Sequence, residues 1–184
     1  LYNMDVRFIN LFIDAVKDVF KTMITADVLV GKPHIKDRDD RDANITAVIG
    51  LSGEVVGSVV LCFPERTAVQ IASQLSGTQM SRKHPDFGDA LGEVLNMVAG
   101  QAKSHFDDLH VNISLPRVLA GQELCVLWSK HVPTLALPFD SSLGRFRVEV
   151  TMVIAEELIR HVFSEVGGID LGDMPHLTYE EAMR

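Results

Sequence analysis

Two side chains with hydrogen-bonding chemistry, Glu93 and Asn96, stand three residues apart in a segment with helical periodicity. At about 100° per residue they fall on the same face of a helix, where side chains three positions apart are neighbours. A carboxylate attracts cations, and an amide both donates and accepts hydrogen bonds, so the pair could engage a polar partner. On this spacing alone, however, an exposed acid and an exposed amide are ordinary solvated surface, and the pattern names no function.

The helix that carries this pair is predicted to span residues 86–109. Its apolar stripe is formed by Phe87, Leu91, Val94, Leu95, Val98, Ala102 and Leu109, and its polar side by Asp89, Glu93, Asn96, Gly100 and Lys103. Asn is a mediocre helix former, and Gly92 and Gly100 each cost about 1 kcal/mol relative to alanine. Poor helix formers around an exposed acid and amide suggest that something approaches the helix closely there.

Motifs for other chemistries are missing from the sequence. Residues 50–53 (Gly-Leu-Ser-Gly) do not form the Gly-x-Ser-x-Gly elbow of hydrolases, and the chain has neither a P-loop nor a His-Glu-x-x-His motif. His105 and His110 are five residues apart and would not share a helix face. Cys62 and Cys125 lie in apolar, strand-like runs without metal-ligand spacing, so we expect small buried hydrophobic residues.

The segments before this helix predict the elements on which it packs. Residues 4–25 have apolar positions at helical spacing, residues 27–36 are extended, and residues 38–42 form a charged, solvated loop. Two Val- and Ile-rich runs, 44–51 and 54–63, read as a hairpin turning at Ser52-Gly53. Pro64 is expected at the first position of a further helix, and Gly77 at its C-terminal cap.

The segments after the helix predict a return to strands, at 111–119, 123–130, 134–139 and 145–154, with Gly121, Pro133 and Gly144 at the turns. Trp128 and Phe139 are expected in the core. The order favours an α+β fold: a central, mainly antiparallel sheet with two long helices packed on one face. We expect one domain over residues 1–154, and a C-terminal helix (155–166) and tail over residues 155–184.

Composition restricts the partners. The formal net charge of −8 argues against a nucleic-acid ligand, because few basic groups could neutralise phosphates. No apolar run reaches the roughly 18 residues of a membrane helix, and the first residues lack the features of a signal peptide. We therefore expect a cytoplasmic protein that binds neither nucleic acid nor membrane.

A longer stretch of sequence carries a family resemblance. Residues 89–103 (DALGEVLNMVAGQAK) resemble the signature helix of the CheC/CheX/FliY chemotaxis phosphatases, whose core is Glu-x-x-Asn followed by an apolar pair and a small residue. Residues 4–10 and 12–16 are similar to the opening helix of CheX proteins, and so is Pro116 after residues 113–115. The resemblance covers roughly residues 4–153. It departs from the family at Leu11, where a proline is common, and in the segment from Ala155.

The resemblance implies a phosphatase that hydrolyses the aspartyl-phosphate of a CheY-like response regulator. Glu93 and Asn96 would be the active pair, with Asn96 positioning the attacking water and Glu93 docking on the receiver's lysine. The opening helix has Asp14 and Lys17 in place of a second Glu and Asn, and one active helix is the CheX pattern. The family further implies a homodimer, no cofactor on this chain, and Mg²⁺ on the partner receiver.

Two other functions stay open on the sequence. The same helix face could dock a receiver without hydrolysing its phosphate, as a non-catalytic binding module. The chain could instead be a structural protein related to the flagellar switch, for which residues 155–184 would offer a binding surface.

Overall fold

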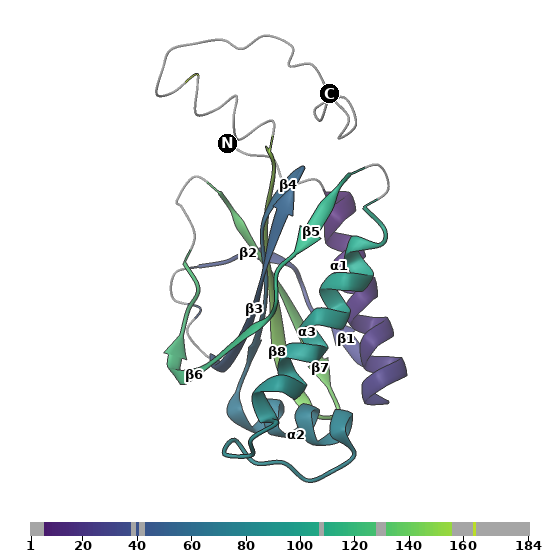
Figure 1. Ribbon diagram of the computed structural model, residues 1–184, viewed down its shortest axis with the longest axis vertical. Coiled ribbons are helices and arrows are strands. Elements are labelled where there is room, and N and C mark those ends of the chain that lie inside the picture. The colour runs from purple at the N-terminus through teal and green to yellow at the C-terminus, as the bar shows by residue number, and fades with distance from the viewer. Residues whose placement is uncertain are drawn as a thin grey trace, which may run out of the picture.

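The fold is an antiparallel sheet with helices on one face (Figure 1). The computed structural model describes residues 6–37, 40, 43–106, 109–127, 132–155 and 164. The helices are α1 (Val6–Val19), continued by the π-helical turn η1 (Phe20–Ile24), α2 (Glu65–Ser76) and α3 (Phe87–Lys103). The strands are β1 (Val28–Val30), β2 (His34–Ile35), β3 (Ala43–Gly53), β4 (Val55–Phe63), β5 (Val111–Ile113), β6 (Arg117–Leu124), β7 (Thr134–Ser141) and β8 (Gly144–Ile154).

Within the described residues, the strands form one sheet in the order β1-β7-β8-β4-β3-β5. Strand β2 extends the pairing of β7, and β6 continues beside β3 after β5. Every pair among the described strands is antiparallel, in agreement with the predicted mainly antiparallel sheet. The longest pairings join β3 to β4 and β4 to β8, so the middle of the sheet is a rigid platform for the helices.

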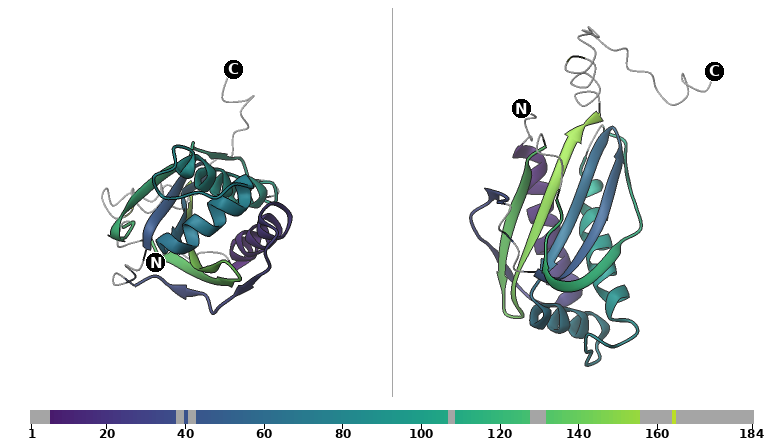
Figure 2. Two further views of the ribbon diagram at one scale, coloured as in Figure 1. Left: turned by 90° about the horizontal axis from the view of Figure 1, so that it is seen from below. Right: turned by 90° about the vertical axis from the view of Figure 1, so that its left-hand side faces the viewer.

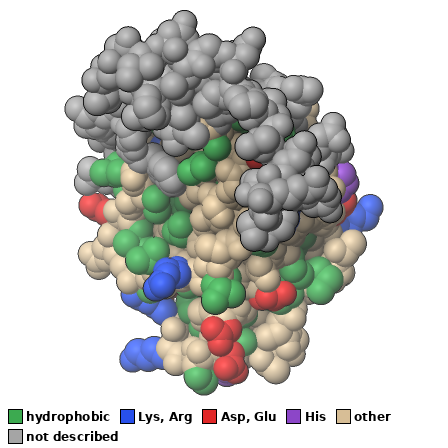
Figure 3. Space-filling view, turned by 45° about the horizontal axis from the view of Figure 1, so that its top comes forward, with side chains coloured by type: hydrophobic (Ala, Val, Ile, Leu, Met, Phe, Trp, Pro, Cys, Tyr) green, Lys and Arg blue, Asp and Glu red, His purple; other side chains and the backbone are tan. Residues whose placement is uncertain are grey.

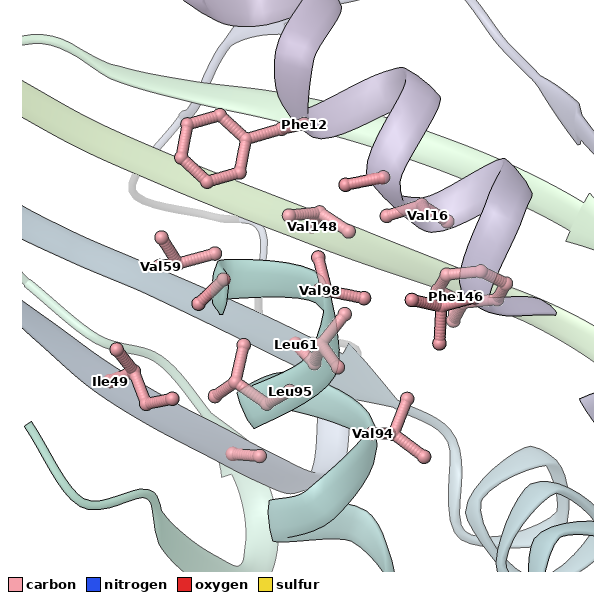
Figure 4. Packing of buried hydrophobic residues seen from close by; sticks show 14 of the residues in the cluster. Phe12, Val16, Ile49, Val59, Leu61, Val94, Leu95, Val98, Phe146 and Val148 are labelled. Carbon is pink, nitrogen blue, oxygen red and sulfur yellow. The ribbon is translucent and has the colours of Figure 1, made fainter. Parts of the chain in front are cut away.

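Helices α1 and α3 pack against each other on the same face of the sheet, and α2 lies across its lower end (Figures 1 and 2). The core fills the space between these helices and the sheet. Figure 4 shows side chains from both layers interdigitating there: Phe12 and Val16 of α1, Val94, Leu95 and Val98 of α3, and Ile49, Val59, Leu61, Phe146 and Val148 of the strands. The predicted apolar stripe is therefore confirmed as the buried face of α3 from Phe87 to Ala102, whereas Leu109 lies beyond the helix and is only partly buried.

Glycine sets two of the predicted turns. Gly53, at the β3–β4 hairpin, has φ 110°, and Gly77, which caps α2, has φ 68°; glycine adopts both values without a steric penalty. Pro64 differs by one position from its prediction. It is the N-cap, with ψ 144°, and the helix begins at Glu65.

Helix α3 ends at Lys103, six residues before the predicted end. The chain leaves the helix in a tight turn, in which Phe106 N donates to Lys103 O at 3.1 Å. Phe106 is then buried against α1. Its ring stacks on that of Phe8, with 5.1 Å between the ring centroids, and meets the ring of Phe12 edge-on, with 6.2 Å between the centroids. Burying this aromatic ring against α1 stabilises the turn more than a continued helix would, so the helix ends here.

The strands after α3 also differ from their prediction. The chain breaks between β5 and β6 at residues 114–116, where Pro116 has no N–H for a ladder hydrogen bond, and not at Gly121. Gly121 lies inside β6, which ends at Leu124. Residues 125–127 are not strand, so the predicted strand 123–130 is wrong over these positions.

Some predictions fall outside the described residues. Trp128, most of the charged loop 38–42, and the closing helix 155–166, apart from Ala155 at its start and Ser164, cannot be compared. Phe139 is buried in the core, as predicted. Strand β8 ends at Ile154, the residue at which we place the end of the first domain, and that boundary stays a proposal.

Candidate active site

Helix α3 carries Glu93 on its exposed side and Asn96 at the border of that side, both away from its buried apolar stripe. It runs between α1 and the sheet edge formed by β5 and β6, and lies over β3 (Figure 1). Asp89 in the first turn and Lys103 in the last complement the helix dipole. Burial of the apolar stripe therefore fixes the rotation of the helix, and with it the direction of the Glu93 and Asn96 side chains.

The candidate pair has no partner among the described residues. Glu93 is exposed and Asn96 is half-buried, and neither side chain hydrogen-bonds or forms an ion pair within the described part of the chain. The Asn96 amide therefore keeps its donors and its acceptor for an incoming group, and the Glu93 carboxylate is open to a cation. The sequence places Asn96 on the polar side of the helix. In the structure this side chain is partly buried and lies at the border of the exposed face.

The two glycines near Glu93 and Asn96, Gly92 and Gly100, differ in what surrounds them. A β-carbon on Gly92 would lie 3.3 Å from Pro116 Cγ and 3.8 Å from Val118 Cγ2, so Gly92 allows the sheet edge to approach α3. A β-carbon on Gly100 would meet nothing within 4 Å. Packing inside the described chain thus explains Gly92 but leaves Gly100 without an internal reason.

On its other side α3 is tied to α1. Gln101 Nε2 donates to Asp18 Oδ2 at 2.8 Å, one residue beyond Gly100. Asp18 lies next to η1, since its carbonyl accepts from Thr22 Oγ1 at 2.6 Å. With the Phe8–Phe106 stack at the far end, these contacts hold the two helices in a fixed register beside the candidate pair.

Cys62 does not offer a thiolate nucleophile to this face. Cys62 is buried on the sheet face away from the helices, and burial, with the nearby Glu149 carboxylate, raises the pKa of its thiol to about 12. At neutral pH it is a thiol and not a thiolate, which agrees with the predicted role of a small buried residue. Cys125 is only partly buried, contrary to the prediction for it.

A buried ionic cluster lies on that same face, away from Glu93 and Asn96. Lys36 pairs with Glu149, and Arg147 donates to the same carboxylate at 3.0 Å. Lys36 also donates to the carbonyl of Val126 at 3.0 Å. The cluster connects Lys36, which follows β2, to strand β8. Sequence patterns gave no sign of it, because Lys36 lies 113 residues from Glu149.

The described residues contain no candidate for a metal site or for a membrane-crossing helix. No group of three or more His, Cys, Asp or Glu side chains there could hold a metal ion. No helix in that part of the chain is long and apolar enough to cross a membrane.

The model of one family, "Chemotaxis phosphatase CheX", matches residues 45–140, just over half of the chain and including the whole of α3. The chain belongs to the CheX family. The family match includes both Glu93 and Asn96, as well as the β5–β6 edge that contacts Gly92.

Individual relatives agree with this assignment. The chain is 28% identical over 124 residues to the CheY-P phosphatase CheX of Thermotoga maritima, covering 66% of this chain and 80% of that protein. A CheC-like superfamily protein from Shewanella sp. PV-4 has a TM-score of 0.74 at 28% identity, over 81% of this chain and 99% of that one. The Borrelia burgdorferi CheX, solved as a CheX-CheY-BeF3-Mg²⁺ complex, shares the fold at a TM-score of 0.69 and 23% identity, over 82% and 99% of the two chains.

These likenesses confirm the family and the fold class. The CheX family is one of chemotaxis phosphatases, so the predicted enzyme class is confirmed. Sequence reasoning missed Pro116 as a neighbour of α3 and gave Leu115 no role. Pro116 enters the sequence analysis only as part of the resemblance, and its closeness to Gly92 follows from the fold alone.

Proposed function

We propose that this chain hydrolyses the phosphoaspartate of a CheY-like receiver domain, with Asn96 and Glu93 as the working pair. The observation that carries the proposal is the polar face of α3 inside a CheX-family match: an acid and an amide without internal partners, beside an open glycine. The Thermotoga maritima relative is named a CheY-P phosphatase, which supports this substrate class.

The reaction needs few functional groups from this chain. A phosphoaspartate is an acyl phosphate, and its hydrolysis needs a water oxygen in line with the P–O bond that breaks. The water oxygen bonds to phosphorus, the receiver's carboxylate leaves, and the water's proton passes to phosphate or solvent. Phosphoryl transfer depends mainly on positioning and electrostatics, so an amide that orients the water supplies most of what is required.

Asn96 has the features of that amide. It is uncharged, half-buried at the border of the exposed face, and unengaged within the described chain. In our proposal its side chain enters the receiver's site and holds the water, as a glutamine does in GTPases. The Gly100 position, one turn further along α3, leaves room for the receiver's backbone to approach.

Glu93 takes a different role. Its exposed carboxylate pairs with the receiver's lysine, and the ion pair sets where the helix docks. Charge-assisted hydrogen bonds of this kind are shorter and stronger than neutral ones, so a single contact can fix the register. No general base is needed from Glu93.

The finer parts of the proposal concern the assembly. The Borrelia burgdorferi structure is of a CheX-CheY-BeF3-Mg²⁺ complex, and we propose that in the complex of this chain the Mg²⁺ is bound by the receiver. We also propose a homodimer and a cytoplasmic setting. Light scattering on the purified full chain measures its mass in solution, and a monomer at all concentrations would contradict the dimer.

The test follows loss of phosphate from phosphorylated receivers encoded in the same genome. Wild type should accelerate the decay, and Asn96→Ala should lower the rate by about 100-fold or to the spontaneous value. Asn112→Ala is the matched control, since Asn112 is an exposed asparagine on β5 that points away from α3. Acceleration by Asn96→Ala equal to that of the control contradicts the assigned role.

The same experiments distinguish the two alternative functions. If wild type binds the receiver but does not speed the decay, the chain is a binding module. If it co-purifies with components of the flagellar switch, it is a structural protein.

A further inference from the structure

The sheet edge beside α3 contains a β-bulge at residues 115–116. Ser114 pairs with Gly50: its N–H donates to Gly50 O at 2.9 Å, and its Oγ accepts from Gly50 N at 2.9 Å. The next pairing joins Arg117 to Val48. Between these pairs, two residues of the edge stand opposite a single residue of β3, which is the definition of a bulge; bulges often redirect side chains near functional sites.

The bulge places both of its side chains on the helix side of the sheet. Ser114 lies on the other side, because a β-carbon on Gly50 would be 3.6 Å from Ser114 Oγ and the neighbours of Gly50 in β3 point into the core. Side chains alternate along a strand, so Leu115 falls on the helix side. Pro116 is on that side too, in contact with α3 at Gly92.

The direction of the chain brings Leu115 toward Asn96. Helix α3 leads through a short connection into β5, and the β5–β6 edge then runs back antiparallel to it (Figure 1). Leu115 precedes Pro116, so it lies further toward the C-terminal end of α3 than Gly92 does. Asn96 is one helical turn beyond Gly92 in that same direction and on the same stripe.

Leu115 is both exposed and held in place. Its relative exposure of 87% is the highest among the exposed large hydrophobic residues of the described chain. The Ser114–Gly50 hydrogen bonds fix the backbone before it, and the following Pro116 restricts its own conformation. Single exposed hydrophobic groups are common, and Figure 3 shows hydrophobic side chains scattered among polar and charged ones. The position of Leu115 beside the candidate pair is what distinguishes it.

We propose that Leu115 is a positioning residue, which makes an apolar contact with the receiver at the rim of its phosphoaspartate site. This inference rests on the proposed function. The Glu93–lysine pair fixes one point of contact, but one point leaves the angle of α3 on the receiver free. A second, apolar point on the Asn96 side of the helix would select one angle as the receiver docks, so its energy contributes to binding of the phosphorylated receiver. The partner group it requires is an apolar side chain on the receiver.

The experiment measures KM and kcat for the phosphorylated receiver with full-length variants. Leu115→Ala should raise KM by about 10-fold, the loss expected for removing one buried leucine contact, and should leave kcat within about 2-fold. Leu29→Ala is the matched control, because Leu29 is 75% exposed on β1 at the opposite edge of the sheet. Leu115→Met keeps an apolar side chain of similar volume and should return KM to near the wild-type value.

Equal KM values for Leu115→Ala and Leu29→Ala would overturn the proposal, and so would a loss confined to kcat. Circular dichroism melts should match wild type, since the side chain is exposed; a lower melting temperature for Leu115→Ala would assign it a structural role instead. If wild type accelerates no receiver, the proposed function fails. Binding to a beryllofluoride-loaded receiver then decides this inference separately: weaker binding by Leu115→Ala than by Leu29→Ala supports the contact, and equal or absent binding contradicts it.

Discussion

A β-carbon on Gly92 would lie 3.3 Å from Pro116 Cγ, so α3 and the sheet edge approach closely at the turn of helix that precedes Asn96. Such a distance is tighter than most contacts of a real β-carbon, and the proline ring is anchored in the bulge. The contact between Gly92 and Pro116 therefore sets the distance between α3 and β6. It also fixes where Asn96, on α3, lies relative to Leu115, in the bulge.

Gly92→Ala and Gly100→Ala should have different effects on stability. Alanine favours the helix by about 1 kcal/mol over glycine, and at Gly100 nothing opposes that gain, so urea unfolding should show stabilisation of about this size. At Gly92 the clash with Pro116 offsets the gain, and we expect no stabilisation or a net loss. Equal stabilisation by both substitutions would contradict the close packing at Gly92.

The Gly100 substitution should also affect the partner. If the receiver's backbone approaches α3 there, Gly100→Ala should slow receiver dephosphorylation several-fold while the protein becomes more stable. Gly88→Ala is a suitable control, because a β-carbon at Gly88 also meets nothing within 4 Å and the residue lies in the first turn of α3. Unchanged activity in Gly100→Ala would show that the receiver keeps its distance at this turn.

Removing Glu149 should destabilise the fold strongly. Its carboxylate is 1% exposed and accepts from both Lys36 and Arg147, so Glu149→Ala would remove the anion that both of these buried side chains contact. Breaking a buried pair in this way costs about 3–5 kcal/mol, which chemical denaturation would measure. The exposed Asp140–Arg145 pair, at 2.8 Å, is the control, and Asp140→Ala should cost at most about 1 kcal/mol.

The two thiols should differ in reactivity. Burial raises the pKa of Cys62 to about 12, whereas Cys125 is partly exposed. A thiol reagent at pH 8 should therefore label Cys125 in the native protein and Cys62 only after unfolding.

The raised pKa of Cys62 should also make the stability of the protein depend on pH. Its contribution is present below the unfolded thiol's value of 9.0 and is lost as the pH rises toward 12. Cys62→Ala should therefore show a smaller loss of stability between pH 9 and 12 than wild type, and an equal loss would contradict this assignment.

Much of the fold was predictable because its elements have strong local signals. The α3 stripe from Phe87 to Ala102 and the Gly53 hairpin follow from periodicity and from glycine's freedom at positive φ. The end of α3 was not predictable, since it depends on Phe106 packing against Phe8 and Phe12, which are almost a hundred residues earlier. Local pattern favours helix to Leu109, and tertiary burial overrides it.

The candidate site divides in the same way. Glu93 and Asn96 can be proposed from the sequence because their three-residue spacing needs only a helix, and the resemblance implies their roles. Leu115 and Pro116 could not be related to them from the sequence, because the bulge is defined by pairing with Gly50 and Val48 in a distant strand. The Lys36–Glu149–Arg147 cluster was missed for the same reason, since it joins a loop to β8 across the chain.

The roles proposed for Glu93 and Asn96 should be separable in binding. Glu93→Gln removes the charge but keeps the shape, so it should weaken binding to a beryllofluoride-loaded receiver, with an effect that diminishes at high salt. Asn96→Ala should bind with nearly wild-type affinity. Titration by fluorescence anisotropy at two salt concentrations measures both, and equal weakening by the two variants would contradict separate roles.

The most direct test of the central claim is the rate of receiver dephosphorylation in single turnover, with Asn96→Ala in saturating excess. Saturation ensures that the receiver is bound, so the rate reports the chemical step alone. We predict that the bound receiver loses its phosphate at its spontaneous rate, whereas wild type at the same concentration accelerates the loss by on the order of 100-fold. A saturated Asn96→Ala complex that turns over as fast as wild type would contradict the assignment of Asn96 as the residue that positions the water.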